Sequence, residues 1–556
     1  MLFDVHHLLL LPLLLGTCRA SADQQKDSVS VDIRNGTVIG VNDDLNQVQR
    51  FLGIPYAQPP VGELRLQHSV PLNASFNTLH AQTFGPACYG PDVDSNPDSN
   101  EDCLTLNIWR PVESKKVEQL KPVLVWFYGG GLQRGYTADP RFEGTNIVRL
   151  SSEIKKEIIL VSVNYRLGPL GFLNGQQLAD LDLLNLGMLD QRLALHWIQE
   201  NIAAFGGDPQ KVTLSGQSAG AVSTYSQMMA YRGRDDKLFR AGILESGGAF
   251  PLTYANTSAF QETFDSLITN TSCISLTNAS AAEQLSCIRG LPIETFLSSV
   301  GSSTGQSIDG SFTQTSIHFA LPAEKYVKVP IIIGTNTDEG TTSAPTGINT
   351  TEQLSIPLAD GFFRPQKLPN STVSRLLSLY PNNPHLGCPY NTGSTPLTAG
   401  KLDKKACSIF GDIVQIGPAR MIAQWLSKNS RIDENTHIPI YRYRFNHLPH
   451  DTDASNVTSG IGTGVEQRYV FSNLVPDHPW DRNLAYEMGS AWISFVHDLD
   501  PNSGVGIEST LPFWPEYGDE GRSMVFSGYG SSIEEDTYRA EAIDYIIENV
   551  LPDGAL

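Results

Sequence analysis

The chain has 556 residues, of which 40% are hydrophobic and 18% are charged. This composition is that of a folded globular protein, and it excludes a disordered, collagen-like or coiled-coil chain. Acidic residues outnumber basic ones by 59 to 39, and the resulting net charge of -20 disfavours nucleic acids and anionic membranes as partners.

The first residues are typical of a secretory signal peptide. An apolar run over residues 8–15 is followed by small residues, and cleavage is expected after Ala20 or Ala22. The run is too short to span a bilayer, so no transmembrane anchor is expected there. A buried N-terminal helix is the alternative, which the polar stretch that follows disfavours. We therefore expect residues 1–20 to be removed and the protein to be secreted.

Apolar runs alternate with helical patterns through the chain. The predicted strands cover residues 123–127, 158–163, 211–214, 241–244, 330–334 and 439–443, and a helix is predicted over 190–202. This alternation predicts an α/β fold with a mostly parallel central sheet covered by helices on both faces. Residues from about 255 to 325 and from about 345 to 430 are expected to form helical insertions over that sheet.

A glycine run follows the first of these strands directly. Tyr128 is followed by Gly129, Gly130 and Gly131. Backbone N–H groups in such a run can point at an oxyanion, whereas the alternative interpretation is a flexible turn. We assign Gly130 and Gly131 as candidate oxyanion donors because they lie at the carboxyl end of a core strand.

A second glycine motif, Gly216-Gln217-Ser218-Ala219-Gly220, follows the strand at 211–214 and precedes a helical stretch. Strand, turn and helix in this order are the context of the G-x-S-x-G nucleophile elbow, which predicts Ser218 as a nucleophile and Ala219 as a further oxyanion donor. A free serine hydroxyl reacts poorly and needs an adjacent base. The alternative is an ordinary Gly/Ser turn, since the five-residue pattern also occurs by chance.

Together with these motifs, longer segments resemble the type B carboxylesterase/lipase family, which includes the cholinesterases and several secreted fungal lipases. The segments are 51–57 (FLGIPYA), 101–109 (EDCLTLNIW), 163–172 (VNYRLGPLGF), 189–195 (LDQRLAL) and 205–209 (FGGDP). The resemblance implies an α/β-hydrolase fold, with residues 21–556 as one catalytic domain that carries insertions.

The same resemblance assigns the acid of a catalytic triad. Residues 331–340 match the family segment that carries this acid, and Glu339 falls on its position. The chain order Ser, Glu, His suits this fold, and a carboxylate at the end of a parallel strand lies on the same edge as the elbow. A surface carboxylate is the alternative.

The sequence departs from the family at the histidine. Glu466 and residues 469–471 hold the family register, which places Thr463 where the histidine is expected. A threonine hydroxyl cannot act as a general base at neutral pH. His447 and His450 lie upstream and are the candidate replacements, and His478 is interpreted as structural. A missing base is preferred over a substituted one.

The cysteines and sequons fit a secreted chain. Six cysteines after the signal segment fall into three locally spaced pairs, which favours short-loop disulfides over a zinc site because no ligand spacing accompanies them. They are Cys88, Cys103, Cys273, Cys287, Cys388 and Cys407. Glycosylation is predicted among the sequons at Asn35, Asn73, Asn256, Asn270, Asn278, Asn349, Asn370 and Asn456. We expect no metal and no other cofactor.

In the resemblance, Cys88 and Cys103 match the family's first disulfide, whose loop forms the lid of its lipases. Here the loop is short and lacks the apolar face that would sit on an oil–water interface. Its polar residues are Asp92, Asp94, Ser95, Asp98, Ser99, Glu101 and Asp102. A soluble or modestly apolar ester is therefore favoured as substrate over bulk triglyceride.

Three functions remain open. The preferred one is a secreted carboxylic ester hydrolase that acts through a serine acyl-enzyme on a small-molecule ester or related apolar substrate. The second is a repurposed α/β-hydrolase that catalyses non-hydrolytic chemistry on a small molecule. The third is a catalytically dead binding module, which the retained Ser218 and glycine runs disfavour.

Overall fold

The computed structural model describes residues 28–91, 98–112, 119–247, 257–300, 305–360, 367–433, 436–450, 460–475, 478–504 and 510–552. The predicted signal peptide therefore lies outside the described residues, as do the sequons at Asn256 and Asn456 and the loop residues Asp92, Asp94 and Ser95. No helix within these ranges has the length and apolar character needed to cross a membrane.

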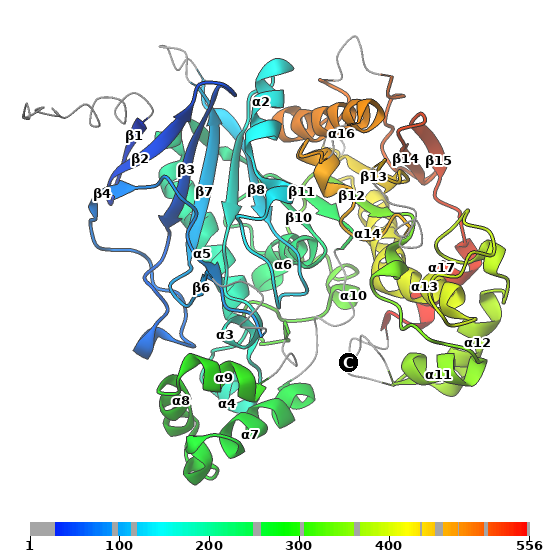
Figure 1. Cartoon of the computed structure of the whole chain (residues 1–556), viewed down its shortest axis with the longest axis horizontal. Helices are drawn as coiled ribbons and strands as arrows, with labels where there is room; N and C mark the ends of the chain where they lie inside the picture. Colours follow the sequence, from blue (N-terminus) through cyan, green and yellow to red (C-terminus); the bar gives the residue numbers. More distant parts are fainter. Residues whose placement is uncertain are drawn as a thin grey trace, which may run out of the picture.

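A large twisted sheet organises the molecule (Figure 1). Its strands run in the order β1-β2-β3-β7-β9-β8-β10-β11-β12-β13-β14-β15, with β4 paired to β2. The strands are β1 (Ser28–Ile33), β2 (Gly36–Asp43), β3 (Val48–Pro55), β4 (Asn77–His80), β7 (Thr105–Pro111), β8 (Lys121–Phe127), β9 (Ile159–Val163), β10 (Gly207–Gln217), β11 (Ala241–Glu245), β12 (Ile331–Asn336), β13 (Ile440–Phe445), β14 (Arg522–Phe526) and β15 (Ser532–Glu535). A separate short pair is formed by β5 (Ala87–Cys88) and β6 (Ser99–Asn100).

The strands from β9 to β14 are parallel, whereas the pairs at both ends of the sheet are antiparallel. Every residue of β9, β11 and β12 is buried. Continuous apolar runs are expected in parallel strands because helices cover both of their faces. The predicted α/β fold and all six predicted strands are confirmed.

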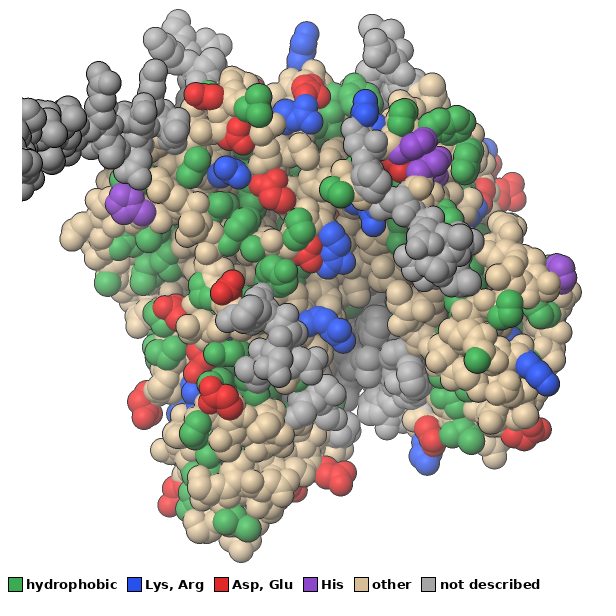
Figure 2. Space-filling view, in the orientation of Figure 1, with side chains coloured by type: hydrophobic (Ala, Val, Ile, Leu, Met, Phe, Trp, Pro, Cys, Tyr) green, Lys and Arg blue, Asp and Glu red, His purple; other side chains and the backbone are tan. Residues whose placement is uncertain are grey.

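Helices cover the sheet and form two lobes beyond it. They are α2 (Thr145–Glu153), α3 (Gly168–Phe172), α4 (Gln176–Asp180), α5 (Leu186–Asn201), α6 (Ala219–Gly233), α7 (Gln261–Thr269), α8 (Ala281–Arg289), α9 (Ile293–Val300), α10 (Ile317–Ala320), α11 (Thr351–Ala359), α12 (Asn370–Leu379), α13 (Asp403–Gly411), α14 (Gly417–Lys428), α15 (Gln467–Val470), α16 (Pro479–Asp498) and α17 (Ala540–Asn549). The first lobe contains α7 to α9 and packs over a smaller apolar core of its own. Figure 2 shows the surface notched between this lobe and the lobe formed by α11 and α12.

Two boundaries differ from the sequence prediction. The helix predicted over 190–202 begins earlier, at Leu186. Within the insertion predicted over residues 345–430, α14 packs directly on β12 and β13 and so belongs to the helices that cover the sheet. The strand predicted over 211–214 extends to Gly207 through a register shift between Gly207 and Val212. Strands β1 to β4 were not predicted; β1, β2 and β4 are only partly buried and lack a continuous apolar run, and glycine interrupts the apolar residues of β3.

A buried ion pair fixes β9 to α5 just behind the site. The guanidinium of Arg166 donates to both carboxylate oxygens of Asp190, at 2.8 and 2.7 Å, and its remaining nitrogen donates to the carbonyl of Gln67 at 2.8 Å. The two side chains are 2% and 0% exposed. Loss of one partner would leave the other charge buried and uncompensated.

We therefore expect Arg166→Met to lower the free energy of unfolding by about 3–5 kcal/mol, because Asp190 keeps its charge without a partner. Urea denaturation followed by tryptophan fluorescence measures this loss. The double variant Arg166→Met/Asp190→Leu should recover most of it. Arg149→Ala, which removes the exposed pair with Glu153, is the control and should cost less than about 0.5 kcal/mol. A single variant as stable as the parent would contradict this role.

Candidate active site

Ser218 stands at a sharp turn between β10 and α6. Its backbone has φ 55° and ψ -120°, and its N–H donates to the carbonyl of Glu245 at 2.8 Å. A positive φ at a serine is strained and is found mainly at functional sites. The strand, the strained turn and the helix together have the geometry of a nucleophile elbow.

The two glycines that flank Ser218 are required by space. A Cβ atom on Gly220 would lie 1.9 Å from the carbonyl oxygen of Phe127, and one on Gly216 would lie 2.3 Å from the carbonyl carbon of Gly220. Both positions are closer than real Cβ contacts allow. The first turn of α6 therefore packs directly on the end of β8.

The glycine run after β8 lies against this elbow. A Cβ atom on Gly129 would lie 3.1 Å from the Cβ of Ser218, and Gly130 and Gly131 have φ of +113° and +68°. These φ values favour glycine, because side chains are strained there. The structure thus brings Gly129, the residue before the predicted oxyanion donors Gly130 and Gly131, against Ser218.

Glu339 occupies the turn after β12. Its side chain is fully buried; Oε1 accepts the N–H of Asn336 at 2.7 Å and Oε2 accepts the hydroxyl of Thr463 at 2.5 Å. Burial raises the pKa of Glu339 to about 7, although the hydrogen bonds from Thr463 and Asn336 oppose the shift. A buried carboxylate that receives a donor is the arrangement in which a triad acid orients its base.

Thr463, at the predicted position of that base, forms several hydrogen bonds through its hydroxyl group. Besides donating to Glu339, its oxygen accepts from the hydroxyl of Thr342 at 2.9 Å and from the amide of Gln415 at 3.5 Å. The structure therefore joins the two residues that the sequence predicted as acid and base position. The hydroxyl of Thr463 cannot accept the proton of a serine, since a neutral hydroxyl is not a base at neutral pH.

Two further buried carboxyl groups lie beside this pair. Glu466 is fully buried; its carboxylate accepts from the amide of Asn336 at 2.5 Å and from the hydroxyl of Ser246 at 3.4 Å. Burial raises the pKa of Glu466 to about 7. Glu245 is also fully buried and accepts from the indole N–H of Trp492 at 2.9 Å, and burial raises its pKa as well.

Sequence reasoning did not assign these two carboxyl groups to the site. Glu466 served only as a register marker, and Glu245 was not considered. The signal that would have found Glu245 is its position at the carboxyl end of β11, next to the elbow strand, where site residues of parallel sheets gather.

The candidate replacement bases lie in another cluster. Nε2 of His447 and Nδ1 of His450 lie 2.6 and 3.0 Å from Oδ1 of Asp481, at the start of α16. The ring of His450 stacks on that of His478 at 4.0 Å, and Nδ1 of His478 accepts the N–H of Trp480. In the described part of the chain no histidine is hydrogen-bonded to Ser218 or Glu339, and these three rings hold a loop against α16.

This cluster was also considered as a metal site. One ligand atom from each of His447, His450 and Asp481 lies within 4.8 Å of the others. However, Nδ1 of His447 accepts the N–H of Gly528 at 3.2 Å, so the ring carries its proton on Nε2 and donates it to Asp481. A metal ion at Nε2 would require the loss of that proton. The cluster therefore fits a hydrogen-bonded hub better than a metal site.

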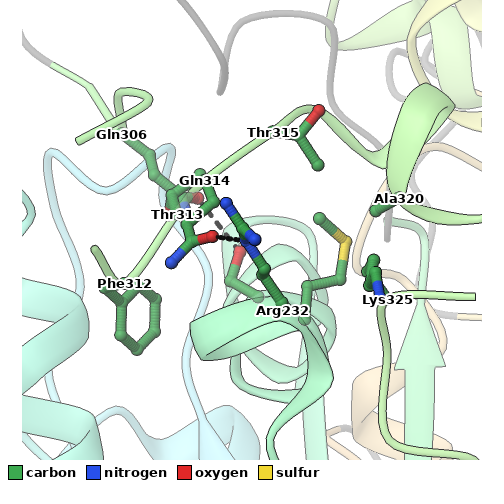
Figure 3. Close-up of a pocket in the computed structure, with 10 residues that line it drawn as sticks. Arg232, Gln306, Phe312, Thr313, Gln314, Thr315, Ala320 and Lys325 are labelled. Atoms are coloured by element: carbon green, nitrogen blue, oxygen red, sulfur yellow. Dashed lines mark hydrogen bonds between the residues drawn. The ribbon is translucent and has the colours of Figure 1, made fainter. Parts of the chain in front are cut away.

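A small cavity lies against α6, the helix that follows Ser218, and is too small for a substrate (Figure 3). Its volume is about 10 Å³, so it can hold at most one water molecule. Ser226 donates to Gln306 at 3.0 Å and Gln306 donates to Thr313 at 2.9 Å across its wall, and Arg232 bonds to Gln314 at its rim. The hydrogen bonds around this cavity join α6 to the segment before α10.

The three local disulfides are confirmed as Cys88–Cys103, Cys273–Cys287 and Cys388–Cys407. One residue of the first loop behaves differently from the prediction. Glu101, named above among the polar residues of the loop, forms a bidentate ion pair with Arg65 at 2.6 and 2.7 Å, and the side chains of Arg65 and Glu101 are only 9% and 12% exposed. Glu101 therefore anchors the base of the loop instead of contributing to its polar surface.

The sequons differ in accessibility. Five of them are exposed, at Asn73, Asn270, Asn278, Asn349 and Asn370. Asn35 is only 9% exposed, and its Nδ2 donates to the carbonyls of Leu72 and Ala74 at 2.8 and 3.0 Å. Glycosylation uses that same nitrogen, so Asn35 is disfavoured and the exposed sequons remain predicted sites.

Because burial raises the pKa of Glu339 to about 7 from its ordinary 4.5, folding favours the neutral carboxyl group. The stability that this group contributes is present below pH 4.5 and is lost as the pH rises through about 7. Glu339→Gln, which mimics the neutral form and can still bond Asn336 and Thr463, should match the parent near pH 4.5. It should be more stable by about 1–3 kcal/mol near pH 8.

Thermal unfolding of both proteins across this pH range measures the difference. Glu339→Ala, which removes the hydrogen bonds as well, should be less stable than the parent at low pH. A stability difference between Glu339→Gln and the parent that does not change with pH would contradict the assignment.

Comparison with known proteins agrees with this geometry. The family model described as "Carboxylesterase family" matches residues 27–545. Secreted lipase 1 of Botryotinia fuckeliana is 33% identical over 544 residues, which cover 90% of each chain, and lipase 2 of Geotrichum candidum is 30% identical over 547 residues, covering 89% of this chain and 91% of the relative. The crystal structure of Aspergillus niger EstA has a TM-score of 0.80 at 26% identity and covers 95% of this chain and 99% of that one. The family predicted from the motifs is thereby confirmed: the chain belongs to the carboxylesterase family, with its α/β-hydrolase fold, and is a carboxylesterase-type hydrolase.

Proposed function

We propose that this chain is a secreted carboxylic ester hydrolase that works through a serine acyl-enzyme on small-molecule esters. The observation that carries the proposal is the strained backbone of Ser218 at the turn between β10 and α6. Such strain has a cost of about 1–3 kcal/mol, and a turn that only connected two elements would not need it. It presents the hydroxyl at the carboxyl edge of the sheet, against the glycine run.

In the proposed reaction, Oγ of Ser218 attacks the ester carbonyl carbon. The N–H groups of Gly130, Gly131 and Ala219 stabilise the oxyanion that forms. The bond to the alkoxy oxygen then breaks, and the alcohol leaves with the proton that Ser218 gave up. Water attacks the acyl carbon in the second half-reaction, and the acid is released with Ser218 restored.

The weak point of this mechanism is proton transfer. Glu339 is buried in the position of the triad acid, but Thr463 receives its orienting bond in place of an imidazole. We therefore propose a slow hydrolase, in which elbow and oxyanion donors retain a part of the rate enhancement. In a related triad these elements alone retain about 10³–10⁴-fold over water.

The names of relatives and the first disulfide loop bear on the substrate class and the location. Relatives carry the names secreted lipase and secreted triacylglycerol lipase, which supports an ester substrate and secretion through the segment at residues 1–20. The short Cys88–Cys103 loop, anchored by Glu101 and Arg65, supports a soluble ester over bulk triglyceride.

One observation favours a second candidate, a repurposed catalyst that does not hydrolyse esters. Glu339, Thr342 and Gln415 take up all the hydrogen-bonding capacity of the Thr463 hydroxyl. These contacts leave no place beside Glu339 for the ring of a relocated histidine. Labelling of Ser218 by a fluorophosphonate without turnover of any ester would favour this candidate. Absence of both labelling and turnover would favour a binding protein.

We expect Ser218→Ala to remove both fluorophosphonate labelling and the turnover of p-nitrophenyl esters, because no other described serine stands on an elbow. Ser223→Ala, one turn further along α6, is the matched control and should retain both. Equal turnover by Ser218→Ala and the parent would place the chemistry elsewhere.

We further expect Thr463→His to raise turnover by at least about 10²-fold, since a positioned general base contributes 10²–10⁴-fold. The gain should disappear in Thr463→His/Glu339→Gln, because the carboxylate fixes the imidazole tautomer and stabilises its charged form.

His447→Ala and His450→Ala test the competing view. Both should leave the parent's turnover within about twofold, since their rings bond to Asp481. A fast parent that loses activity in either variant would show that a relocated histidine serves as base.

A further inference from the structure

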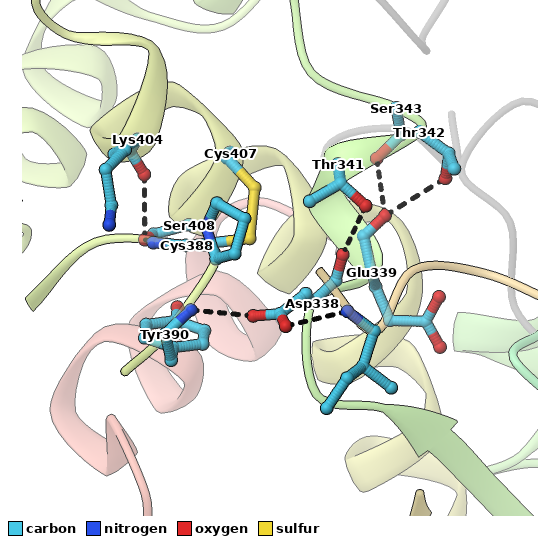
Figure 4. The surroundings of a disulfide bond; sticks show 12 residues. Asp338, Glu339, Thr341, Thr342, Ser343, Cys388, Tyr390, Lys404, Cys407 and Ser408 are labelled. Carbon is cyan, nitrogen blue, oxygen red and sulfur yellow. Dashed lines mark hydrogen bonds between the residues drawn. A yellow bond between two sulfur atoms is a disulfide. The ribbon is translucent and has the colours of Figure 1, made fainter. Parts of the chain in front are cut away.

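Asp338, the residue before Glu339, is a buried carboxylate that joins three segments of the site. It is only 2% exposed. Its Oδ2 accepts the N–H of Ile461 at 2.9 Å, and its Oδ1 accepts the N–H of Tyr390 at 2.8 Å. The N–H of Asp338 in turn donates to the carbonyl of Ile461 at 3.0 Å. Both oxygens are thus bonded to backbone from segments distant in sequence (Figure 4).

The first of these segments carries Thr463. Gly460 has φ of +58°, and a Cβ atom there would lie 2.7 Å from Oδ2 of Asp338 and 2.8 Å from Pro389. The chain therefore packs closely on the carboxylate at residues 460–461, and two residues later Thr463 reaches Glu339 at 2.5 Å. The position of Thr463 follows from how Asp338 holds this segment.

The second segment is the turn closed by the Cys388–Cys407 disulfide. The N–H of Cys388 donates to the hydroxyl of Ser408 at 3.0 Å. A Cβ atom on Gly340 would lie 1.9 Å from the carbonyl oxygen of Cys407, so the loop after Glu339 packs directly on α13. The acid loop is therefore held between α13 and the turn that carries Tyr390 (Figure 4).

The charge of Asp338 also acts on its neighbours. Burial raises the pKa of Asp338, and the nearby guanidinium groups of Arg539 and Arg444 oppose that shift. Lys404 on α13 faces Asp338 as well. The negative charge of Asp338 contributes to the raised pKa of Glu339, whose other charged neighbour is Glu466.

We propose that Asp338 is a positioning residue of this site: it fixes the segment at residues 460–463 against Glu339 and supplies the negative charge beside that acid. The inference deepens the proposed function and rests on it for its kinetic consequences. It does not depend on which residue occupies position 463.

Asp338→Asn tests both parts with little change of volume. An asparagine can accept only one of the two N–H groups, and its NH₂ meets the other as a second donor. We expect faster hydrogen–deuterium exchange in peptides that cover residues 388–393 and 460–466. In the Thr463→His background, kcat for a p-nitrophenyl ester should fall about 10- to 100-fold, with KM within about threefold, because the imidazole loses its alignment.

The pH profile is the readout that a purely structural role would not move. Removal of the charge of Asp338 lowers the pKa of Glu339, so the acidic limb of the kcat profile should shift to lower pH.

Asp403→Asn is the matched control. Asp403 is a fully buried carboxylate on the neighbouring α13 and likewise accepts backbone N–H groups, from Gly347, Ile348 and Gly400. We expect Asp403→Asn to lose thermal stability to an extent similar to Asp338→Asn. In the Thr463→His background, its kcat should change by less than about twofold, and the acidic limb of its kcat profile should not move.

Unchanged exchange over residues 460–466 in Asp338→Asn, or a kcat and pH profile equal to those of Asp403→Asn, would overturn the inference. Exchange does not require turnover. If no variant hydrolyses esters, faster exchange in Asp338→Asn still supports the positioning role, whereas the failure then belongs to the proposed function.

Discussion

The close approach of β10, α6 and the end of β8 is the constraint on which the site depends. Gly216 and Gly220 leave no space for a side chain, so the first turn of α6 rests on the carbonyl of Phe127. This contact fixes Ser218 in a strained conformation and sets the glycine run of residues 129–131 beside it. The many contacts of the large buried sheet fix the positions of β8, β10 and α6, so the sheet can hold the strained backbone of Ser218.

The acid side of the site is unusual in its electrostatics. Glu245 and Glu339, at the ends of adjacent strands, and Glu466, just before α15, are all fully buried. Their hydrogen bonds come from neutral donors: Trp492, Asn336, Ser246 and Thr463. An imidazolium between the acid and the serine would compensate this negative charge during a reaction. Because burial raises the pKa of each of these carboxyl groups and no cationic side chain in the described part of the chain bonds to them, their neutral forms are favoured.

Hydrogen bonds tie the segment that carries Thr463 to its surroundings. Thr463 makes three side-chain hydrogen bonds, and its segment is tied to Asp338, which also holds the disulfide turn through Tyr390. Around Thr463, the amide oxygens of Asn336 and Gln415 are buried without a hydrogen-bond partner among the described residues. The polar network at the predicted base position is therefore only partly satisfied.

The sequence by itself determined the six central strands of the sheet and the three local disulfides, and it predicted the elbow, the glycine run and Glu339 as the acid. Each is encoded locally, in an apolar run, a fixed glycine spacing or a short loop. It also predicts that Thr463 stands where the family has a histidine, because neighbouring residues keep the family register. The tertiary structure decided the rest. Only the fold brings Asp338 to Ile461 and Tyr390, Glu245 and Glu466 to the acid, and His447 and His450 to Asp481. Those contacts join residues far apart in the chain, and a hydrogen bond across such a distance leaves no periodic pattern in the sequence.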